Sequence, residues 1–150
     1  MILFTLTGSL LIAQGTHSPM VGAQMPIPNP NNESIIVEVA NHVIDNINAE
    51  KPMNTSTKPF VLIEVLEATR RVVAGFLYHL TLAAGQGRCP SRRRRKYDYV
   101  QYGIRREKCR LLRRGEMRIY KAEVLHAPHE VQQIRVLGKD LVYSFNYSSY

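Results

Sequence analysis

The sequence predicts an α+β protein in which one amphipathic helix covers one face of an antiparallel β-sheet. Two observations lead to this fold class. Apolar residues recur at helical spacing in one segment near the N-terminus. Four segments with strand-like patterns follow that segment, and the chain has no internal sequence repeat. A helix followed by consecutive strands favours an antiparallel sheet over an alternating α/β arrangement.

Residues 16–33 are predicted to form an extended arm, because its prolines push the residues before them into extended geometry. The helix is predicted over residues 34–50, with Asn31 or Asn32 capping its start and Pro52 stopping its end. Polar residues occupy the side of this helix opposite to its apolar face. Four residues define the apolar face: Ile36, Ala40, Val43 and Ile47.

The first two strands are predicted to form a hairpin, since the short sequence Ala74-Gly75 interrupts an otherwise extended region. A long surface excursion is predicted over residues 85–115, and a turn around Pro128 joins the last two strands. Period-two alternation of apolar residues supports the second strand in particular. The four strands are predicted over residues 60–73, 76–82, 117–126 and 131–145.

The composition is that of one globular domain, with 150 residues of which 45% are hydrophobic. The formal net charge is +8, which attracts acidic proteins, nucleic acid, heparin-like polymers and anionic membranes alike. One basic run is predicted to be a solvated loop, with a tether to anionic polymers and a dibasic processing site as alternatives. The run comprises Arg92, Arg93, Arg94, Arg95 and Lys96.

The N-terminus has the pattern of a secretory signal peptide. Residues 1–13 are mostly apolar, and Ala13 and Gly15 supply small residues at the two recognition positions of a cleavage site. We therefore expect a signal peptide over residues 1–15, a mature domain over residues 16–150 and a secreted protein. An uncleaved anchor is the alternative, but the apolar stretch is too short to span a bilayer of about 30 Å as a helix.

Two further features agree with export. Cys89 and Cys109 are the only cysteines, and in an oxidising compartment they are expected to form a disulfide bond. Three sequons provide glycosylation candidates at Asn32, Asn54 and Asn146.

No constellation for catalysis is evident in the sequence. The five histidines form no His-Glu-x-x-His helix, and no nucleophile elbow is present. His126 and His129 lie close together, but a metal site needs further ligands that the sequence does not indicate. We therefore predict that the protein is not an enzyme and has no catalytic residue, metal ligand or cofactor.

Three segments stand out in register around the predicted helix. They are Met20-Val21-Gly22-Ala23 in the arm, Arg71-Val72-Val73-Ala74-Gly75 at the hairpin, and His126-Ala127-Pro128-His129-Glu130 at the last turn. Together they resemble the cystatin family, whose members carry an arm glycine, a Gln-x-Val-x-Gly motif and a Pro-Trp pair in these places. The resemblance covers about residues 20–147 and looks closest to secreted cystatins of blood-feeding arthropods.

The resemblance implies a cystatin-like fold and reversible, tight-binding inhibition of papain-like cysteine peptidases such as cathepsins. The arm and both hairpin tips would form one edge that enters the active-site cleft, and the inhibitor is expected to act as a monomer. The residues that would contact the peptidase are Val21, Gly22, Arg71, Val72, Val73, Ala74, Gly75, Pro128 and His129.

The chain departs from the family pattern at several positions. Arg71 stands where the family has Gln, and His129 stands where it has the apolar anchor Trp. Secreted cystatins usually carry two disulfides; Cys89 and Cys109 match the first pair, whereas Tyr120 and Tyr147 stand where the second pair is expected. The net charge and His129 favour an alternative function, a non-inhibitory cationic protein on the same fold that binds anionic surfaces or polymers. The Val-Val-Ala-Gly turn and Gly22 favour the inhibitor.

Overall fold

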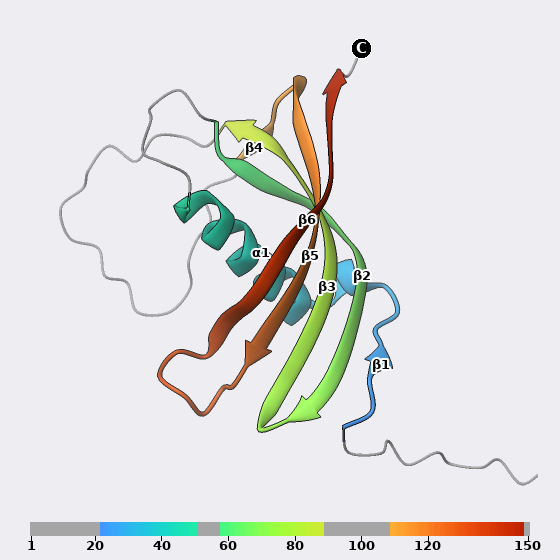
Figure 1. Cartoon of the computed structure of the whole chain (residues 1–150), viewed down its shortest axis with the longest axis vertical. Coiled ribbons are helices and arrows are strands. Elements are labelled where there is room, and N and C mark those ends of the chain that lie inside the picture. Colours follow the sequence, from blue (N-terminus) through green and yellow to red (C-terminus); the bar gives the residue numbers. More distant parts are fainter. Residues whose placement is uncertain (1–21, 51–57, 89–108, 149–150) are drawn as a thin grey trace, which may run out of the picture.

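A computed structural model describes residues 22–50, 58–88 and 109–148 of the chain. Within these ranges, one α-helix packs on one face of a six-stranded antiparallel sheet (Figure 1), which confirms the predicted α+β fold class. The strand order is β1-β2-β3-β5-β6, and the short β4 pairs with β3. The strands are β1 (Met25–Pro26), β2 (Phe60–Val73), β3 (Gly75–Arg88), β4 (Arg110–Leu111), β5 (Arg114–His126) and β6 (Ile134–Ser148).

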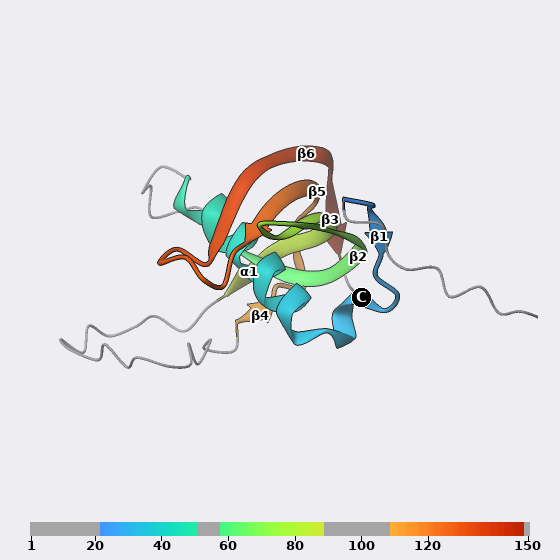
Figure 2. The same cartoon turned by 90° about the horizontal axis from the view of Figure 1, so that it is seen from below.

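The four long strands curve around the helix α1 (Ser34–Ala49), as Figure 2 shows from below. Register shifts accompany the curvature, two of them between β2 and β3 and two between β5 and β6. Such irregularities bend a strand and increase its right-handed twist. The sheet can therefore cover the helix along most of its length.

The core lies between α1 and the concave face of the sheet. All four residues of the predicted apolar helix face are buried, three of them with no exposed surface and Ile47 with 5%. Phe60, Leu80, Leu82 and Val124 are buried on the sheet side of the same cluster. Burying each such side chain stabilises the fold by about 1.5–3 kcal/mol.

The predicted cap of the helix was wrong. Glu33 occupies the N-cap position and makes no side-chain capping bond, while Asn31 lies in a 3-10 helix, η1 (Pro30–Asn32). The Asn31 side chain instead donates a hydrogen bond to the Val65 carbonyl (2.9 Å) and accepts one from the Val65 N–H (2.7 Å). β1 pairs with β2 only at Thr69 and Arg70, so Asn31 provides hydrogen-bond partners farther along the same edge of β2.

Asn48 makes the same pair of contacts at the other end of the helix. Its amide nitrogen donates to the Phe60 carbonyl and its amide oxygen accepts from the Phe60 N–H, both at 2.8 Å. These two hydrogen bonds join the end of α1 to the start of β2. Residues 51–57 lie outside the described residues, and they include Pro52 and the glycosylation candidate Asn54. Two asparagines therefore anchor the helical layer to β2.

The second strand is longer than predicted, because β3 continues to Arg88. The end of β3 contains Gly85 and Gly87, and these two glycines led to the prediction of a loop there. Neighbouring side chains occupy the space above both glycines: a Cβ on Gly85 would lie 2.5 Å from Leu111, and one on Gly87 would lie 2.7 Å from Val61. The predicted excursion is accordingly shorter at both ends, since β5 already begins at Arg114.

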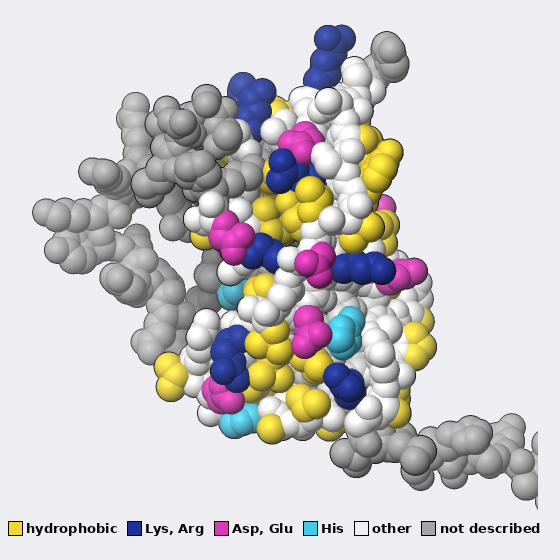
Figure 3. Space-filling view, in the orientation of Figure 1, with side chains coloured by type: hydrophobic (Ala, Val, Ile, Leu, Met, Phe, Trp, Pro, Cys, Tyr) yellow, Lys and Arg dark blue, Asp and Glu magenta, His cyan; other side chains and the backbone are white. Residues whose placement is uncertain are grey.

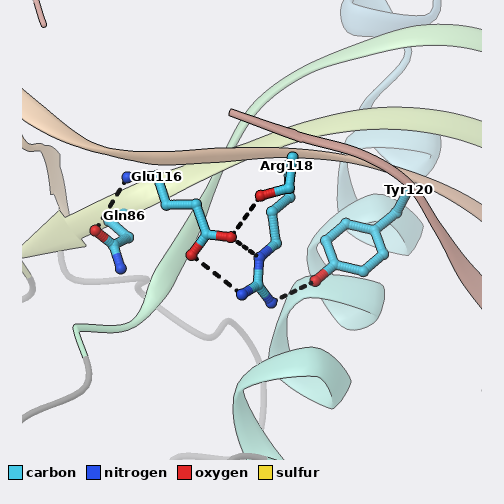
Figure 4. Close-up of polar contacts among 5 residues, drawn as sticks. Gln86, Glu116, Arg118 and Tyr120 are labelled. Atoms are coloured by element: carbon cyan, nitrogen blue, oxygen red, sulfur yellow. Dashed lines mark hydrogen bonds and ion pairs between the residues drawn. The ribbon is translucent and has the colours of Figure 1, made fainter. Parts of the chain in front are cut away.

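Arg118 closes the core beside the end of β3 (Figure 4). Its guanidinium binds the Glu116 carboxylate through two hydrogen bonds of 2.6 and 3.1 Å and donates to the Tyr120 hydroxyl at 3.2 Å. The same group lies 4.6 Å from the centre of the Phe60 ring. The hydrogen bonds to Glu116 stabilise the charged guanidinium and raise the pKa of Arg118.

The interpretation of Tyr120 and Tyr147 as replacements for one disulfide was wrong. The strand register pairs Tyr120 with Leu141 and Tyr147 with Gly115. A disulfide needs Cα atoms within about 7 Å, whereas Leu141, which faces Tyr120, lies six residues before Tyr147 along β6, about 20 Å away. Tyr147 has a different role, because its hydroxyl donates a hydrogen bond to the Leu112 carbonyl (2.6 Å).

Cys109 carries no free thiol and is disulfide-bonded. Its expected partner Cys89 lies outside the described residues, so the pairing of these two residues stays a prediction. Asn32 and Asn146 are exposed, and their glycosylation likewise stays a prediction. In the described part of the chain, no helix is long and apolar enough to cross a membrane.

The Asn31 contact generates a stability prediction. Asn31→Ala should lower the free energy of unfolding by about 1–3 kcal/mol, because it leaves the N–H and C=O of buried Val65 without their partners. Asn32→Ala is the matched control: Asn32 is exposed in the same 3-10 helix and should change the stability by less than about 0.5 kcal/mol. Urea unfolding of the two variants checks this, and equal stabilities would contradict the role given to Asn31.

Candidate functional site

Three segments of the chain meet at one end of the sheet. The strand register pairs Phe76 of β3 with His126 of β5, so the β2–β3 and β5–β6 turns lie next to each other. Met25 of β1 pairs with Arg70 of β2, and the same register continued would bring Gly22 level with Val73. All three segments lie at the lower end of the molecule in Figure 1. The structure thus brings the predicted arm and turns together, while Val21 lies outside the described residues.

The β2–β3 turn is narrow and apolar. Val73 pairs with Gly75 across the single residue Ala74, and Gly75 has a φ of 116°. Val72 and Val73 are 39% and 43% exposed, although both are apolar, and Ala74 is exposed as well. A narrow turn between two long paired strands has little conformational freedom, so these side chains are presented in a fixed arrangement.

Gly75 also forms the contact between the two turns. A Cβ at this position would lie 2.5 Å from the His126 carbonyl oxygen and 3.2 Å from the Ala127 Cα. Only glycine permits both the positive φ and this approach of one backbone to the other. The sequence pattern indicated the tight turn but not the packing of Gly75 against the second turn.

Backbone hydrogen bonds hold the β5–β6 turn. The Ala127 N–H donates to the Gln133 carbonyl at 2.7 Å, and the Glu130 N–H donates to the Ala127 carbonyl at 3.0 Å. Ala127 has no exposed surface, whereas Pro128 and His129 are exposed. The buried Ala127 therefore attaches the turn to the sheet and leaves the next two residues at its tip.

The two histidines of this turn differ in role. The His126 ring stacks on Tyr78, with ring centres 6.5 Å apart, and is part of the packed side of the sheet. His129 points away from the core as an exposed residue. Among the described residues, no three His, Cys, Asp or Glu side chains lie close enough to hold a metal ion.

Residues 22–113 match a known protein family, described as the cystatin domain. This chain belongs to the cystatin family. Cystatins are inhibitors rather than enzymes. The matched segment contains Gly22, the helix and the whole β2–β3 turn, but it ends before the turn that carries Pro128 and His129. The membership therefore rests on the first two of the three segments that form the edge.

Solved structures show the same fold. Al-CPI is 19% identical with a TM-score of 0.54, and the similarity covers 81% of this chain and 100% of that one. Dimeric human cystatin F is 15% identical with a TM-score of 0.57 over 93% and 100% of the two chains. The salivary cystatin from the soft tick Ornithodoros moubata is 19% identical with a TM-score of 0.51 over 81% and 98%. No curated protein sequence matches this cystatin.

The face of the sheet turned away from the helix carries two arginines close to the turns. The register aligns Arg71, Leu77, Leu125 and Arg135 in one row across β2, β3, β5 and β6. Figure 3 shows Lys or Arg side chains on both sides of an apolar patch in the lower half of this face. Arg135 forms an ion pair with Glu130 at 3.0 Å. Sequence reasoning singled out Arg71 but missed Arg135, because only the strand register shows that the two share a row.

Arg70 and Arg71 are neighbours in sequence with opposite environments. Successive side chains of a strand point to opposite faces, and the Arg70 guanidinium lies on the helix side, 5.6 Å from the centre of the Phe76 ring. Burial raises the pKa of Tyr78 beside it, although the positive charge of Arg70 acts in the opposite direction. Arg70 is thus part of the packing, whereas Arg71 faces outwards.

The contact between the turns generates the second prediction. Gly75→Ala should lower the free energy of unfolding by about 1–3 kcal/mol, because alanine is strained at this φ and its Cβ meets the His126 carbonyl. Gly138→Ala in β6 is the matched control, since nothing lies within 4 Å of the added Cβ. Its effect should stay within about 0.5 kcal/mol. Thermal or urea unfolding measures both, and a Gly75→Ala variant as stable as the control would show that the turns are not in contact.

Proposed function

We propose that this cystatin is a reversible inhibitor of papain-like cysteine peptidases of the cathepsin type, and that its three-part edge enters the active-site cleft. The observation that carries the proposal is the exposed apolar turn at Val72, Val73 and Ala74, which Gly75 holds against the neighbouring turn. Family membership supports the same conclusion. An active-site cleft is a concave, partly apolar surface, and a narrow apolar edge is complementary to it.

The proposed inhibition needs no covalent step. The edge blocks access of substrate to the cleft, and burial of Val72 and Val73 supplies much of the binding free energy. Because the turn is already held between paired strands, little conformational entropy is lost when the complex forms. Affinity therefore depends on how completely the apolar tip is buried.

The N-terminal arm completes the proposed edge. Gly22 has a φ of 89°, a conformation that glycine adopts readily, and it lies next to β1 at the same end of the sheet. We propose that this bend directs Val21 and the residues before it into the unprimed substrate subsites. The proposal includes secretion, with a signal peptide over residues 1–15 and the domain over residues 16–150, and one structurally similar cystatin is salivary.

The alternative function is a cationic protein that binds anionic polymers. The net charge of +8 favours it, as does His129 where the family has Trp. The basic run at residues 92–96 lies outside the described residues. A titration against papain and a panel of cathepsins distinguishes the two functions, because a protein of the alternative class would bind heparin in a salt-dependent manner without inhibiting any of them.

The third prediction tests the apolar tip. Val73→Asp should weaken inhibition at least tenfold, because a carboxylate would have to be desolvated in the cleft. Val142→Asp is the matched control, since Val142 is also an exposed valine, 53% exposed, and lies eight residues beyond the start of β6. Inhibition constants measured for both variants check this, with unfolding curves to establish that both are folded. Equal inhibition constants would place the contact surface elsewhere.

The fourth prediction concerns the second turn. His129→Trp should strengthen inhibition, because a Trp at an interface buries apolar surface that His cannot match, worth about 1–3 kcal/mol or roughly tenfold to a hundredfold in the inhibition constant. His129 is exposed, so the stability should change little. The inhibition constant and the unfolding midpoint are measured together. An unchanged inhibition constant would mean that the Pro128–His129 tip lies outside the interface.

A further inference from the structure

We propose that Arg71 selects peptidases whose cleft rim carries a carboxylate beside the β2–β3 turn. This inference rests on the proposed function and deepens it by naming the chemistry of the preferred partner. The family motif has a neutral Gln at this position, and this chain has a cation. The structure shows where that cation lies and which groups it meets.

Arg71 lies directly behind the exposed tip. It is two residues before Val73 in β2, so the two side chains point to the same face of the strand, about 7 Å apart along it. Val73 is 43% exposed and would be covered by the partner. A partner that covers Val73 must therefore bring its rim within reach of the Arg71 side chain.

Arg71 has no counter-ion among the described residues. Its Nε is buried without a hydrogen-bond partner. Three carboxylates of the same face contact other groups. Glu123 lies 3.6 Å from His79, Glu67 accepts a hydrogen bond from Thr81 at 3.5 Å, and Glu130 forms an ion pair with Arg135 at 3.0 Å. No carboxylate of the described surface therefore forms an ion pair with Arg71.

The surroundings of Arg71 make the charge selective. On its row it adjoins Leu77, which is 7% exposed, and Leu125, so an approaching rim would meet a cation beside an apolar strip. A partly buried guanidinium that is covered without an anion loses hydration and gains nothing, whereas a carboxylate can bind it through two hydrogen bonds. An acidic rim is therefore favoured, and a basic rim is rejected by like-charge repulsion.

The experiment measures association rate constants at low and high salt with a cathepsin-type peptidase whose cleft rim is acidic. Arg71→Gln restores the family residue and should lower the rate about threefold to tenfold at low salt, with the difference largely lost at high salt. Arg114→Gln is the matched control, because it removes an equal charge from an exposed residue at the opposite end of β5. It should change the rate less than twofold. Glu130→Gln frees Arg135 and should raise the rate.

The same measurements with the rim carboxylates of the peptidase replaced by their amides complete the test. The unmodified inhibitor and the Arg71→Gln variant should then have equal association rate constants. Inhibition with equal rates for the Arg71→Gln and Arg114→Gln variants would overturn the role of Arg71 and leave the proposed function standing. If the unmodified chain inhibits none of these peptidases while it is folded, both the proposed function and this inference fail.

Discussion

The arrangement of the candidate site depends on the close approach of two backbones at Gly75. Its Cα faces the His126 carbonyl and the Ala127 Cα with no space for a Cβ. This contact keeps the β2–β3 turn beside the β5–β6 turn at the point where β3 and β5 begin to pair. The pairing of β3 with β5 sets the two turns side by side, and the contact at Gly75 lets their backbones approach closely. The tips thus form one continuous edge whose shape is set before any partner arrives.

The helix illustrates what sequence alone can predict. Its apolar face follows a helical period, so Ile36 and Ala40 were identified as core residues without knowledge of their partners. Its cap could not be predicted in the same way. Asn31 is a good capping residue, but it binds Val65 because β1 pairs with only two residues of β2 and leaves backbone groups there to be satisfied. A local propensity was overridden by a requirement of the sheet edge.

The strands show the same limit in a different form. The alternation of side chains predicted two hairpins, but the glycines at 85 and 87 were interpreted as a loop and not as the continuation of β3. These positions require glycine because the side chains of Leu111 and Val61 fill the space that a Cβ would take. The residues of the candidate site were identified through the family resemblance, yet their adjacency and the row from Arg71 to Arg135 depend on register. Register is a long-range property, and no short motif encodes it.

Two consecutive arginines show how the sheet separates structural and functional roles. The pleat turns Arg70 towards the helix side, where it covers Phe76, and turns Arg71 outwards behind Val73. A change at the first position disturbs packing, while a change at the second alters the charge that a partner meets. The apolar tip and the adjacent cation can thus vary independently, since apolar burial governs the dissociation of a complex and charge chiefly governs its rate of formation. A scaffold with this division can change its preferred partner at position 71 without rebuilding the edge that Gly75 holds in place.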